Sequence, residues 1–286
     1  MANSLARKIA NELNLDLSGS SRVTGGDINE ALRLDTPEGS WFVKYQDNPL
    51  GADMLRTEAT GLKALAQTDL IGVPEVIWQG MVDGTACLVL PFLETGPKRT
   101  DNLERLGREL AILHREATND KYGFQEDNFI GSLPQSNQQR ATAVEFFIQE
   151  RLQPQWERAR NSGYLSEYQT AWNNLLGALP SLIPEEQPSL IHGDLWGGNY
   201  LIDPAGKPWL IDPAVAFAPR EMDLAMSALF GGFGPAFYRA YENVWPTQPG
   251  YADREPLYQL YYLLVHVNLF GAGYEGSVRR ILQRFS

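Results

Sequence analysis

The stretch Leu190–Asp212 of this 286-residue chain reads LIHGDLWGGNYLIDPAGKPWLID, and it decides how the rest of the sequence is interpreted. Four of its side chains can carry chemistry: His192, Asp194, Asn199 and Asp212. Asn199 follows Asp194 by five residues, and Asp212 follows Asn199 by thirteen. A single Asp or Asn beside Gly usually marks a turn, but four such groups at these spacings indicate a functional site.

A β-hairpin is predicted inside this stretch. Two short apolar segments, residues 200–203 and 208–211, flank the turn-forming sequence Pro-Ala-Gly-Lys at 204–207. A hairpin of this length would return Asp212 close to Asn199, with Asp194 nearby.

Asn199 and Asp212 are therefore predicted Mg²⁺ ligands, because this ion takes a few protein oxygens and completes its octahedron with phosphate and water. Asp194 could then accept the proton of an attacking hydroxyl, as the base of a phosphoryl transfer. The alternative is that these residues only shape turns. His192 is expected to hold the loop by hydrogen bonds rather than to react.

The order of these residues matches the kinase catalytic-loop pattern His-x-Asp-x-x-x-x-Asn, followed by a metal-binding Asp. Two features depart from protein kinases. Gly193 replaces the Arg of that pattern, and the last motif is Ile211-Asp212-Pro213 rather than Asp-Phe-Gly. The chain thus resembles kinase-like small-molecule phosphotransferases, such as aminoglycoside and choline kinases.

A kinase-like fold needs a nucleotide site in the N-terminal part of the chain. Gly25 and Gly26 lie between two predicted strands and are candidates for the phosphate-binding turn, although a Gly pair also suits an ordinary hairpin. Lys44 lies in an apolar strand, and Glu58 follows it in a predicted helix. We expect an ion pair between them that aims the ammonium group at the α- and β-phosphates. A lysine that faces water from an edge strand is the alternative.

Residues 87–94 lead out of the last predicted strand, and the resemblance implies that they form the hinge that hydrogen-bonds adenine. Pro91 has no N–H but keeps its carbonyl, so it could accept from the adenine amino group. Leu93 could donate its N–H.

Longer motifs resemble one family in particular. They are residues 192–199, 211–214, 220–225 and 258–271, with residues 25–29, 42–44 and 58–62 upstream. The chain resembles the fructosamine kinase (ketosamine-3-kinase) family over roughly residues 20–280. The resemblance implies an α+β, two-lobe, protein-kinase-like fold, with a small antiparallel β-sheet lobe that carries one main helix and a larger, mostly helical lobe.

The resemblance also implies an ATP- and Mg²⁺-dependent enzyme that phosphorylates the 3-hydroxyl of a ketosamine, including a glycated amine or lysine. The phosphorylated adduct is unstable, so the amine is regenerated. Asp194 would activate the hydroxyl, and Trp196 would form an apolar wall under the sugar, because sugar C–H faces pack on aromatic rings. Core packing is the alternative for Trp196. His266 and Asn268 would border the acceptor pocket, and Arg220 and Asp223 would form a buried pair under the catalytic loop.

Hydrophobic patterns predict two lobes, residues 1–94 and 95–286. Strands are expected in the first lobe at 21–24, 31–34, 41–45, 75–79 and 86–92, with one helix at 54–66. Helices are expected in the second lobe at 103–115, 142–153, 165–182 and over most of 221–286. Residues 117–139 are expected to be a loop.

Composition limits the partners. The chain has 24 basic and 35 acidic residues, a net charge of -11, which argues against nucleic acid and against an anionic membrane surface. Its single cysteine, Cys87, and the absence of a signal-peptide pattern favour the cytoplasm. A monomer is expected, with a dimer left open.

Two other functions are weighed against ketosamine phosphorylation. One keeps the chemistry and changes the acceptor to an aminoglycoside, choline or homoserine. The other is a nucleotide-binding module without catalysis, against which the complete set of Lys44, Asp194, Asn199 and Asp212 argues.

Overall fold

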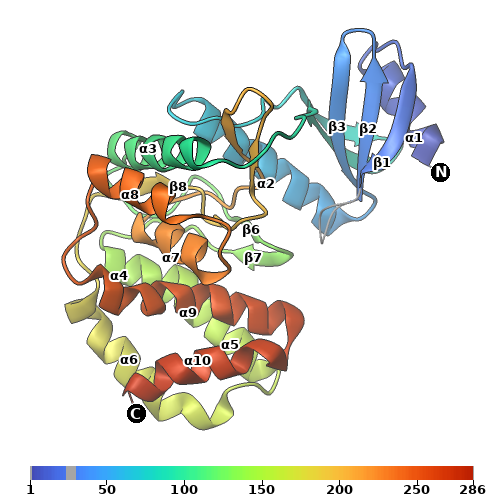
Figure 1. Ribbon diagram of the computed structural model, residues 1–286. Coiled ribbons are helices and arrows are strands. Elements are labelled where there is room, and N and C mark those ends of the chain that lie inside the picture. Colours follow the sequence, from blue (N-terminus) through green and yellow to red (C-terminus); the bar gives the residue numbers. More distant parts are fainter. Residues whose placement is uncertain (1, 24–29, 286) are drawn as a thin grey trace. The chain divides into compact units, whose positions relative to one another are not determined.

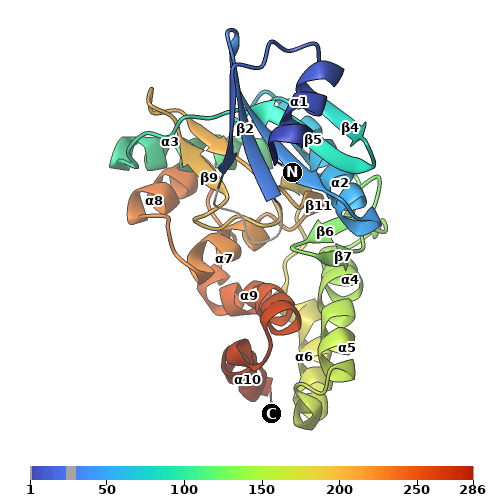
Figure 2. The same cartoon turned by 90° about the vertical axis from the view of Figure 1, so that its right-hand side faces the viewer.

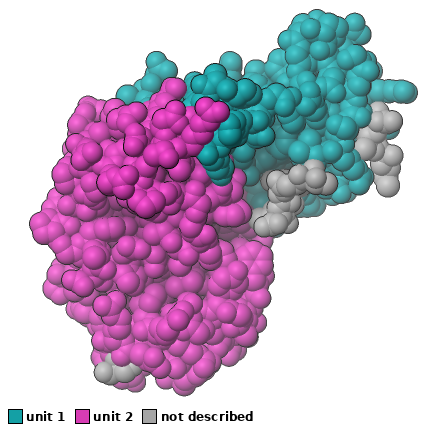
Figure 3. Space-filling view, in the orientation of Figure 1, with its two compact units in different colours: residues 1–98, 201–212 teal, residues 99–200, 213–286 magenta. Residues whose placement is uncertain are grey.

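The computed structural model describes residues 2–23 and 30–285, with the side chains of Ala2 and Asn3 left out. The chain divides into two compact units (Figure 3). The first unit comprises residues 1–98 and 201–212, and the second comprises residues 99–200 and 213–286. We expected lobes of residues 1–94 and 95–286. The observed division differs, because residues 201–212 join the first unit although they follow the predicted catalytic loop, residues 192–199, in the sequence.

The first unit contains a five-stranded antiparallel sheet of order β1-β2-β3-β5-β4. Its strands are β1 (Gly19–Val23), β2 (Glu30–Thr36), β3 (Gly39–Gln46), β4 (Trp78–Val82) and β5 (Thr85–Pro91). Successive side chains of a strand point to opposite faces. Val43 therefore joins the core on one face with Leu32 and Val89, while Lys44 lies on the other face, in register with Leu88.

Helices cover both faces of this sheet. α1 (Ala2–Glu12) packs Ala6 and Ile9 against the Val43 face, and Figure 2 shows it against the strands. α2 (Pro49–Ala66) contacts β3, β4 and β5. It begins with Pro49 after the N-cap Asn48, whose side chain accepts a hydrogen bond from the Gly51 N–H at 2.8 Å. Both are typical helix-start features, because the first N–H groups of a helix have no partner within it.

The second unit is mostly helical (Figure 1). Its α-helices are α3 (Thr100–Glu116), α4 (Ala143–Phe146), α5 (Gln153–Asn161), α6 (Gln169–Leu182), α7 (Glu221–Leu229), α8 (Pro235–Val244), α9 (Tyr251–Phe270) and α10 (Glu275–Leu282). Short strands form two antiparallel pairs, β6 (Asn128–Ile130) with β7 (Leu133–Gln135) and β8 (Ser189–Ile191) with β11 (Ala216–Ala218). A π-helix, Phe147–Leu152, links α4 to α5, and 3-10 turns occupy Ser166–Tyr168, Ala272–Tyr274 and Gln283–Phe285.

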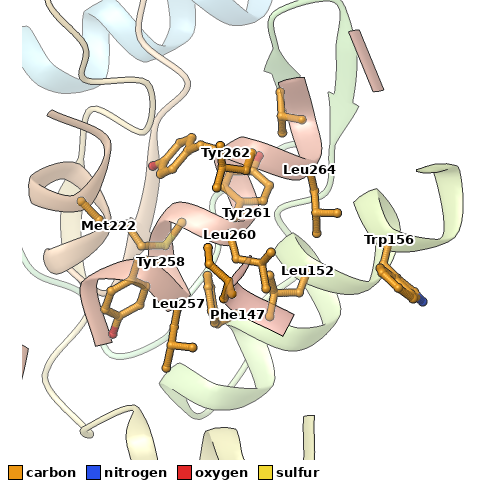
Figure 4. Packing of buried hydrophobic residues seen from close by; sticks show 14 of the residues in the cluster. Phe147, Leu152, Trp156, Met222, Leu257, Tyr258, Leu260, Tyr261, Tyr262 and Leu264 are labelled. Carbon is orange, nitrogen blue, oxygen red and sulfur yellow. The ribbon is translucent and has the colours of Figure 1, made fainter. Parts of the chain in front are cut away.

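The core of the second unit is built around α9 (Figure 4). Side chains from both ends of this helix are buried, and Tyr258 meets Phe147 edge to face, with ring centroids 5.1 Å apart. α3 packs closely along α8, because Gly107 has no side chain. A Cβ there would lie 2.2 Å from the carbonyl oxygen of Phe237.

The predicted fold class is confirmed: it is α+β, with an antiparallel sheet in one unit and a mostly helical second unit. Several local predictions are wrong. Residues 128–135 form a hairpin inside the segment expected to be a loop, and β4 begins at Trp78 rather than at residue 75. The helix expected at 165–182 begins at Gln169, after Leu165 with a left-handed φ of 58°. Within residues 2–23 and 30–285, no helix is long and apolar enough to span a membrane.

Candidate functional site

Lys44 of the first unit binds two carboxylates. Its ammonium Nζ lies 2.8 Å from Oε1 of Glu58 on α2 and also donates to Oδ1 of Asp212. The lysine side chain is only 6% exposed, so the alternative of a lysine facing water is wrong. Lys44 lies on the face of the sheet toward α2, because it binds Glu58 of that helix. The expected Lys44–Glu58 ion pair is therefore present.

The electrostatics of this group keep Lys44 charged. Burial alone would lower the pKa of Lys44, but the carboxylates of Asp212 and Glu58 outweigh burial and raise it above its ordinary value. Burial raises the pKa of Glu58 although the ammonium group of Lys44 opposes the shift. A phosphate that approached this lysine would meet a permanent cation held in place by a buried partner.

Asp212 follows a hairpin of strands β9 (Tyr200–Ile202) and β10 (Pro208–Leu210). Asp212 reaches Lys44 because this hairpin is hydrogen-bonded to the rest of the first unit. The Leu210 N–H donates to the Gly72 carbonyl at 2.8 Å, and the Gly96 N–H donates to the Ile202 carbonyl at 2.7 Å. These two bonds explain why residues 201–212 belong to the first unit. Asp212 itself has a left-handed φ of 56°, a conformation that Asp tolerates better than most residues.

Two of the other nucleotide-site candidates, Pro91 and Leu93, lie at the end of β5. Pro91 ends β5 in register with Trp41, and the next N–H, that of Phe92, donates to the Ser40 carbonyl at 2.9 Å. Leu93 follows where this ladder ends. Gly25 and Gly26 lie outside the described residues.

The predicted catalytic loop of the second unit, residues 192–199, is held by Asp223 of α7. Both carboxylate oxygens accept backbone hydrogen bonds, Oδ2 from the His192 N–H at 2.7 Å and Oδ1 from the Gly193 N–H at 2.8 Å. His114 of α3 adds a third contact, with Nε2 at 3.2 Å from Oδ2. Asp223 and His114 are fully buried. A carboxylate that accepts several hydrogen bonds fixes the backbone around it.

The expected Arg220–Asp223 pair is wrong. Arg220 instead forms an ion pair with Glu186 at 3.1 Å and donates to the hydroxyl of Tyr241 and to the carbonyls of Trp245 and Pro246. The two residues are three apart at the start of α7, and tertiary packing gives each its own set of partners.

Gly193 occupies a position that no other residue fits without strain. Its φ is 84°, and a Cβ would lie 2.0 Å from the Ala214 carbonyl oxygen. The backbone of the loop is held there, because the Ala214 N–H donates to the His192 carbonyl at 2.8 Å. This close approach explains why the chain has Gly where protein kinases have Arg in this pattern.

Asp194 and Asn199 lie side by side in the same loop. The Asn199 amide Nδ2 donates to the Asp194 carboxylate Oδ2 at 3.1 Å and to the Asp194 carbonyl at 2.9 Å. The Asp194 N–H donates to Nδ1 of His192 at 3.2 Å, so His192 has the structural contact expected of it. Because the amide nitrogen of Asn199 faces Asp194, its oxygen Oδ1 is the atom that remains for a cation.

Trp196 lies two residues beyond Asp194 and is 37% exposed, so core packing does not account for it. Its ring covers Gly198, where a Cβ would lie 2.3 Å from a ring carbon. The backbone at Gly197 meets the loop after α7, because a Cβ on Gly197 would lie 3.0 Å from the Gly231 carbonyl oxygen. Gly198 thus leaves room for an exposed indole ring beside this loop.

His266 and Asn268 occupy different surroundings on α9. His266 Nδ1 lies 2.8 Å from the Tyr262 carbonyl, and its ring contacts Phe230, Phe270 and Tyr274 at centroid distances of 4.5, 5.4 and 4.9 Å. Burial lowers the pKa of His266 below its ordinary value. Asn268 instead donates to the carbonyl and the side-chain oxygen of Gln155, at 2.9 and 2.8 Å. Its polar group is therefore largely committed to α5.

Comparisons with known proteins identify the family of the chain. The sequence model of the family described as Fructosamine kinase matches residues 1–286. The chain belongs to the fructosamine kinase family.

Individual relatives cover nearly the whole chain. It is 39% identical to the "Probable ketoamine kinase" of Synechocystis sp., over 92% of this chain and 88% of that protein. It is 39% identical to the chloroplastic protein-ribulosamine 3-kinase of Oryza sativa subsp. indica, over 94% of this chain and 79% of that protein. The crystal structure of a candidate fructosamine-3-kinase from Thermobifida fusca superposes with a TM-score of 0.88, at 32% identity, covering 99% of this chain and 98% of that one. The predicted family, enzyme class and kinase-like fold are confirmed.

Two groups of site residues are brought together in this fructosamine kinase family member. Lys44, Glu58 and Asp212 meet in the first unit, and Asp194 and Asn199 meet in the second. The predicted metal site takes Asn199 from one unit and Asp212 from the other, and it stays a prediction. His114 was missed at the sequence level because a lone His in an amphipathic helix gives no signal of its own.

Proposed function

We propose that the protein transfers the γ-phosphoryl group of ATP to the 3-hydroxyl of a ketosamine. The main support for this proposal is the geometry of the predicted catalytic loop. Asp223 fixes the backbone that precedes Asp194, and the side chain of Asn199 orients the Asp194 carboxylate. Family membership supplies the acceptor class, because the relatives named above are ketoamine and ribulosamine kinases.

The Asp194 carboxylate acts as the base. It accepts the proton of the 3-hydroxyl while the oxygen forms a bond to the γ-phosphorus, and the bond from that phosphorus to the β,γ-bridging oxygen breaks to release ADP. The hydrogen bond from Asn199 Nδ2 to Oδ2 holds the carboxylate in one orientation. A positioned base of this kind contributes about 10²–10⁴-fold to the rate.

The chemistry of the two proposed donors, Asn199 and Asp212, supports Mg²⁺ as the ion of the proposed site. Asn199 would offer Oδ1 and Asp212 would offer the oxygen that Lys44 does not occupy, which suits an ion that takes few protein oxygens. When bound, the ion would neutralise phosphate charge. Lys44 would add a fixed positive charge toward the α- and β-phosphates, with Glu58 holding it in place.

Trp196 and His266 are proposed acceptor contacts. A ketosamine could lay its apolar C–H face on the exposed indole of Trp196. Because the pKa of His266 is lowered, its imidazole is neutral at pH 7 and can exchange a hydrogen bond with a sugar hydroxyl. Asn268 enters this proposal only weakly, since its amide already donates to Gln155. We further propose a cytoplasmic monomer.

An acceptor panel tests the proposal. ATP consumption is measured with a fructosamine, a ribulosamine, choline, homoserine and kanamycin, and the phosphorylated position is identified by NMR. We expect turnover of the ketosamines with phosphate on the 3-hydroxyl. Turnover of only another acceptor would refute the acceptor class, and nucleotide binding without turnover of any acceptor would refute catalysis.

Two substitutions separate the roles. Asp194→Ala should lower kcat at least 10²-fold and leave ATP binding largely intact. Lys44→Met should raise the KM for ATP at least tenfold, because Lys44 is assigned to the phosphates of ATP. It should leave the KM for the ketosamine unchanged, because Lys44 is not among the proposed acceptor contacts. Near-normal turnover by Asp194→Ala would contradict the assignment of the base.

A further inference from the structure

A cavity of about 440 Å³ lies in the second unit, outside the residues assigned to the reaction. Its walls come from α7, the loop that follows it, α8 and the first turns of α9. The lining residues that matter here are Phe233, Tyr238, Tyr241, Glu242, Tyr251 and Glu255. Small-molecule sites are typically about 300–1,000 Å³, so the volume suits a small organic ligand.

The cavity is acidic. Two carboxylates line it, those of Glu242 and Glu255, and no basic residue lines it within the described part of the chain. Glu242 accepts from the backbone N–H and hydroxyl of Thr247, at 3.0 and 2.8 Å, so it holds the loop after α8. Glu255 Oε1 accepts from the Gln259 amide at 2.8 Å. Among the described residues, neither carboxylate forms an ion pair with Lys, Arg or His.

Glu255 is a partly buried carboxylate of this cavity. Partial burial raises its pKa above the ordinary value, so the charged form is disfavoured. Burial also raises the pKa of Tyr238 and Tyr251, and the carboxylate of Glu255 raises both further, which places it close to their hydroxyls. A positive charge here would stabilise the carboxylate.

Aromatic rings make up much of the remaining wall. Phe233, Tyr238, Tyr241 and Tyr251 line the cavity, and aromatic ring faces attract cations. This lining suits an organic cation better than a divalent metal, which needs several oxygen ligands in a tight shell. An alkyl chain would pack on the rings while its charged end met Glu255.

We propose that this cavity binds an organic cation, an alkyl chain that ends in an ammonium or guanidinium group. The assignment of a bound organic cation goes beyond the proposed kinase function, and only the kinetic arm of its test rests on that function.

The cavity is in direct contact with the supports of the catalytic loop. The hydroxyl of Tyr241 lies 2.9 Å from Nδ1 of His114, whose other ring nitrogen meets Asp223. Gly231 also lines the cavity, and a Cβ on Gly197 would lie 3.0 Å from its carbonyl oxygen. The cation could therefore be the charged end of the acceptor, or a separate amine that stabilises the loop.

The test uses n-pentylammonium and its neutral isostere 1-pentanol as probes. Binding to the full chain is measured by ligand-observed NMR titration at pH 7.5, without ATP. We expect pentylammonium to bind at least tenfold more tightly than 1-pentanol. Glu255→Gln should remove that preference, because the amide can still accept from Gln259 but carries no charge.

Asp253→Asn is the matched control. Asp253 is an exposed carboxylate on the same helix that does not line the cavity, so its loss should leave both affinities unchanged. Tyr251→Leu should weaken pentylammonium severalfold through loss of a ring face, which keeps the test valid if Glu255→Gln does not fold. Equal binding of the two probes to the wild type, or identical behaviour of Glu255→Gln and Asp253→Asn, would overturn the proposal.

A kinetic arm identifies the source of the cation. Two ketosamines are compared, one made from 1,5-diaminopentane and one from 5-aminopentanol. If Glu255→Gln raises only the KM of the ammonium-tailed adduct, the cavity takes the acceptor's charged end. If both KM values are unchanged and pentylammonium stays bound in the presence of the adduct, the cavity takes a separate amine. The titration involves no turnover, so its failure is distinguishable from failure of the proposed kinase function.

Discussion

Asp223→Asn tests the claim that one buried carboxylate holds the catalytic loop. Asn has the same shape, but one of the two positions that now accept a backbone N–H would become an NH₂ group. Either the His192 N–H or the Gly193 N–H would then face a donor at the present 2.7–2.8 Å separation. The contact with His114 Nε2 would also weaken, because the acceptor would be neutral.

The magnitude follows from the contacts that are lost. A hydrogen bond to a charged group contributes about 1.5–3 kcal/mol, and a buried donor left without an acceptor costs about 1–3 kcal/mol. Asp223 is fully buried, so water cannot replace it without rearrangement. We expect Asp223→Asn to lower the free energy of unfolding by about 3–5 kcal/mol. The loop should also lose its fixed geometry, which should lower kcat at least tenfold.

The assay pairs urea unfolding with steady-state kinetics. Stability is measured from the denaturation midpoint at constant m-value, and kcat and both KM values are measured on the folded variant. Asp253→Asn provides the control, since an exposed carboxylate should change stability by less than about 0.5 kcal/mol. A loss below about 1 kcal/mol together with wild-type kcat would refute the view that Asp223 positions the loop.

Three further predictions concern single residues. Gly193→Ala should lower kcat at least 10²-fold, because the new methyl group would meet the Ala214 carbonyl at 2.0 Å and the backbone has a φ of 84°; wild-type kinetics would contradict the assigned strain. His266 should titrate below pH 6.5 in an NMR pH titration, since burial lowers its pKa. The folded protein favours the neutral form of His266, so the contribution of His266 to stability is complete above about pH 6.5 and is lost as the pH falls through the lowered pKa. A midpoint of the His266 NMR titration at or above pH 6.5 would contradict the burial argument. Cys87 is buried and burial raises its pKa to about 12, so the folded protein at pH 8 should react with a thiol reagent at least 10²-fold more slowly than the unfolded chain; equal rates would show that the thiol is accessible.

Local pattern and spacing were enough to predict several parts of this protein. Leucines at three- and four-residue intervals predicted the helix at 103–115, and the structure has α3 there because one apolar face repeats with the helical period. The Lys44–Glu58 pair was predictable because the catalytic-loop pattern resembles that of kinases, and a kinase-like fold pairs a strand lysine with a carboxylate of the helix that follows. Asp194 and Asn199 were predictable because they lie within one short loop, where sequence spacing limits distance in space.

Tertiary structure decided what depends on residues far apart in the chain. Asp223 could not be matched to its partners from sequence, because the N–H groups of residues 192 and 193 and the ring of His114 reach it from other elements. Asn268 turned toward Gln155 for the same reason. Backbone hydrogen bonds to Gly72 and Gly96 assigned residues 201–212 to the first unit and placed Asp212 against Lys44. Local pattern predicts which faces are apolar, but a buried polar group bonds to whichever partner packing brings within reach.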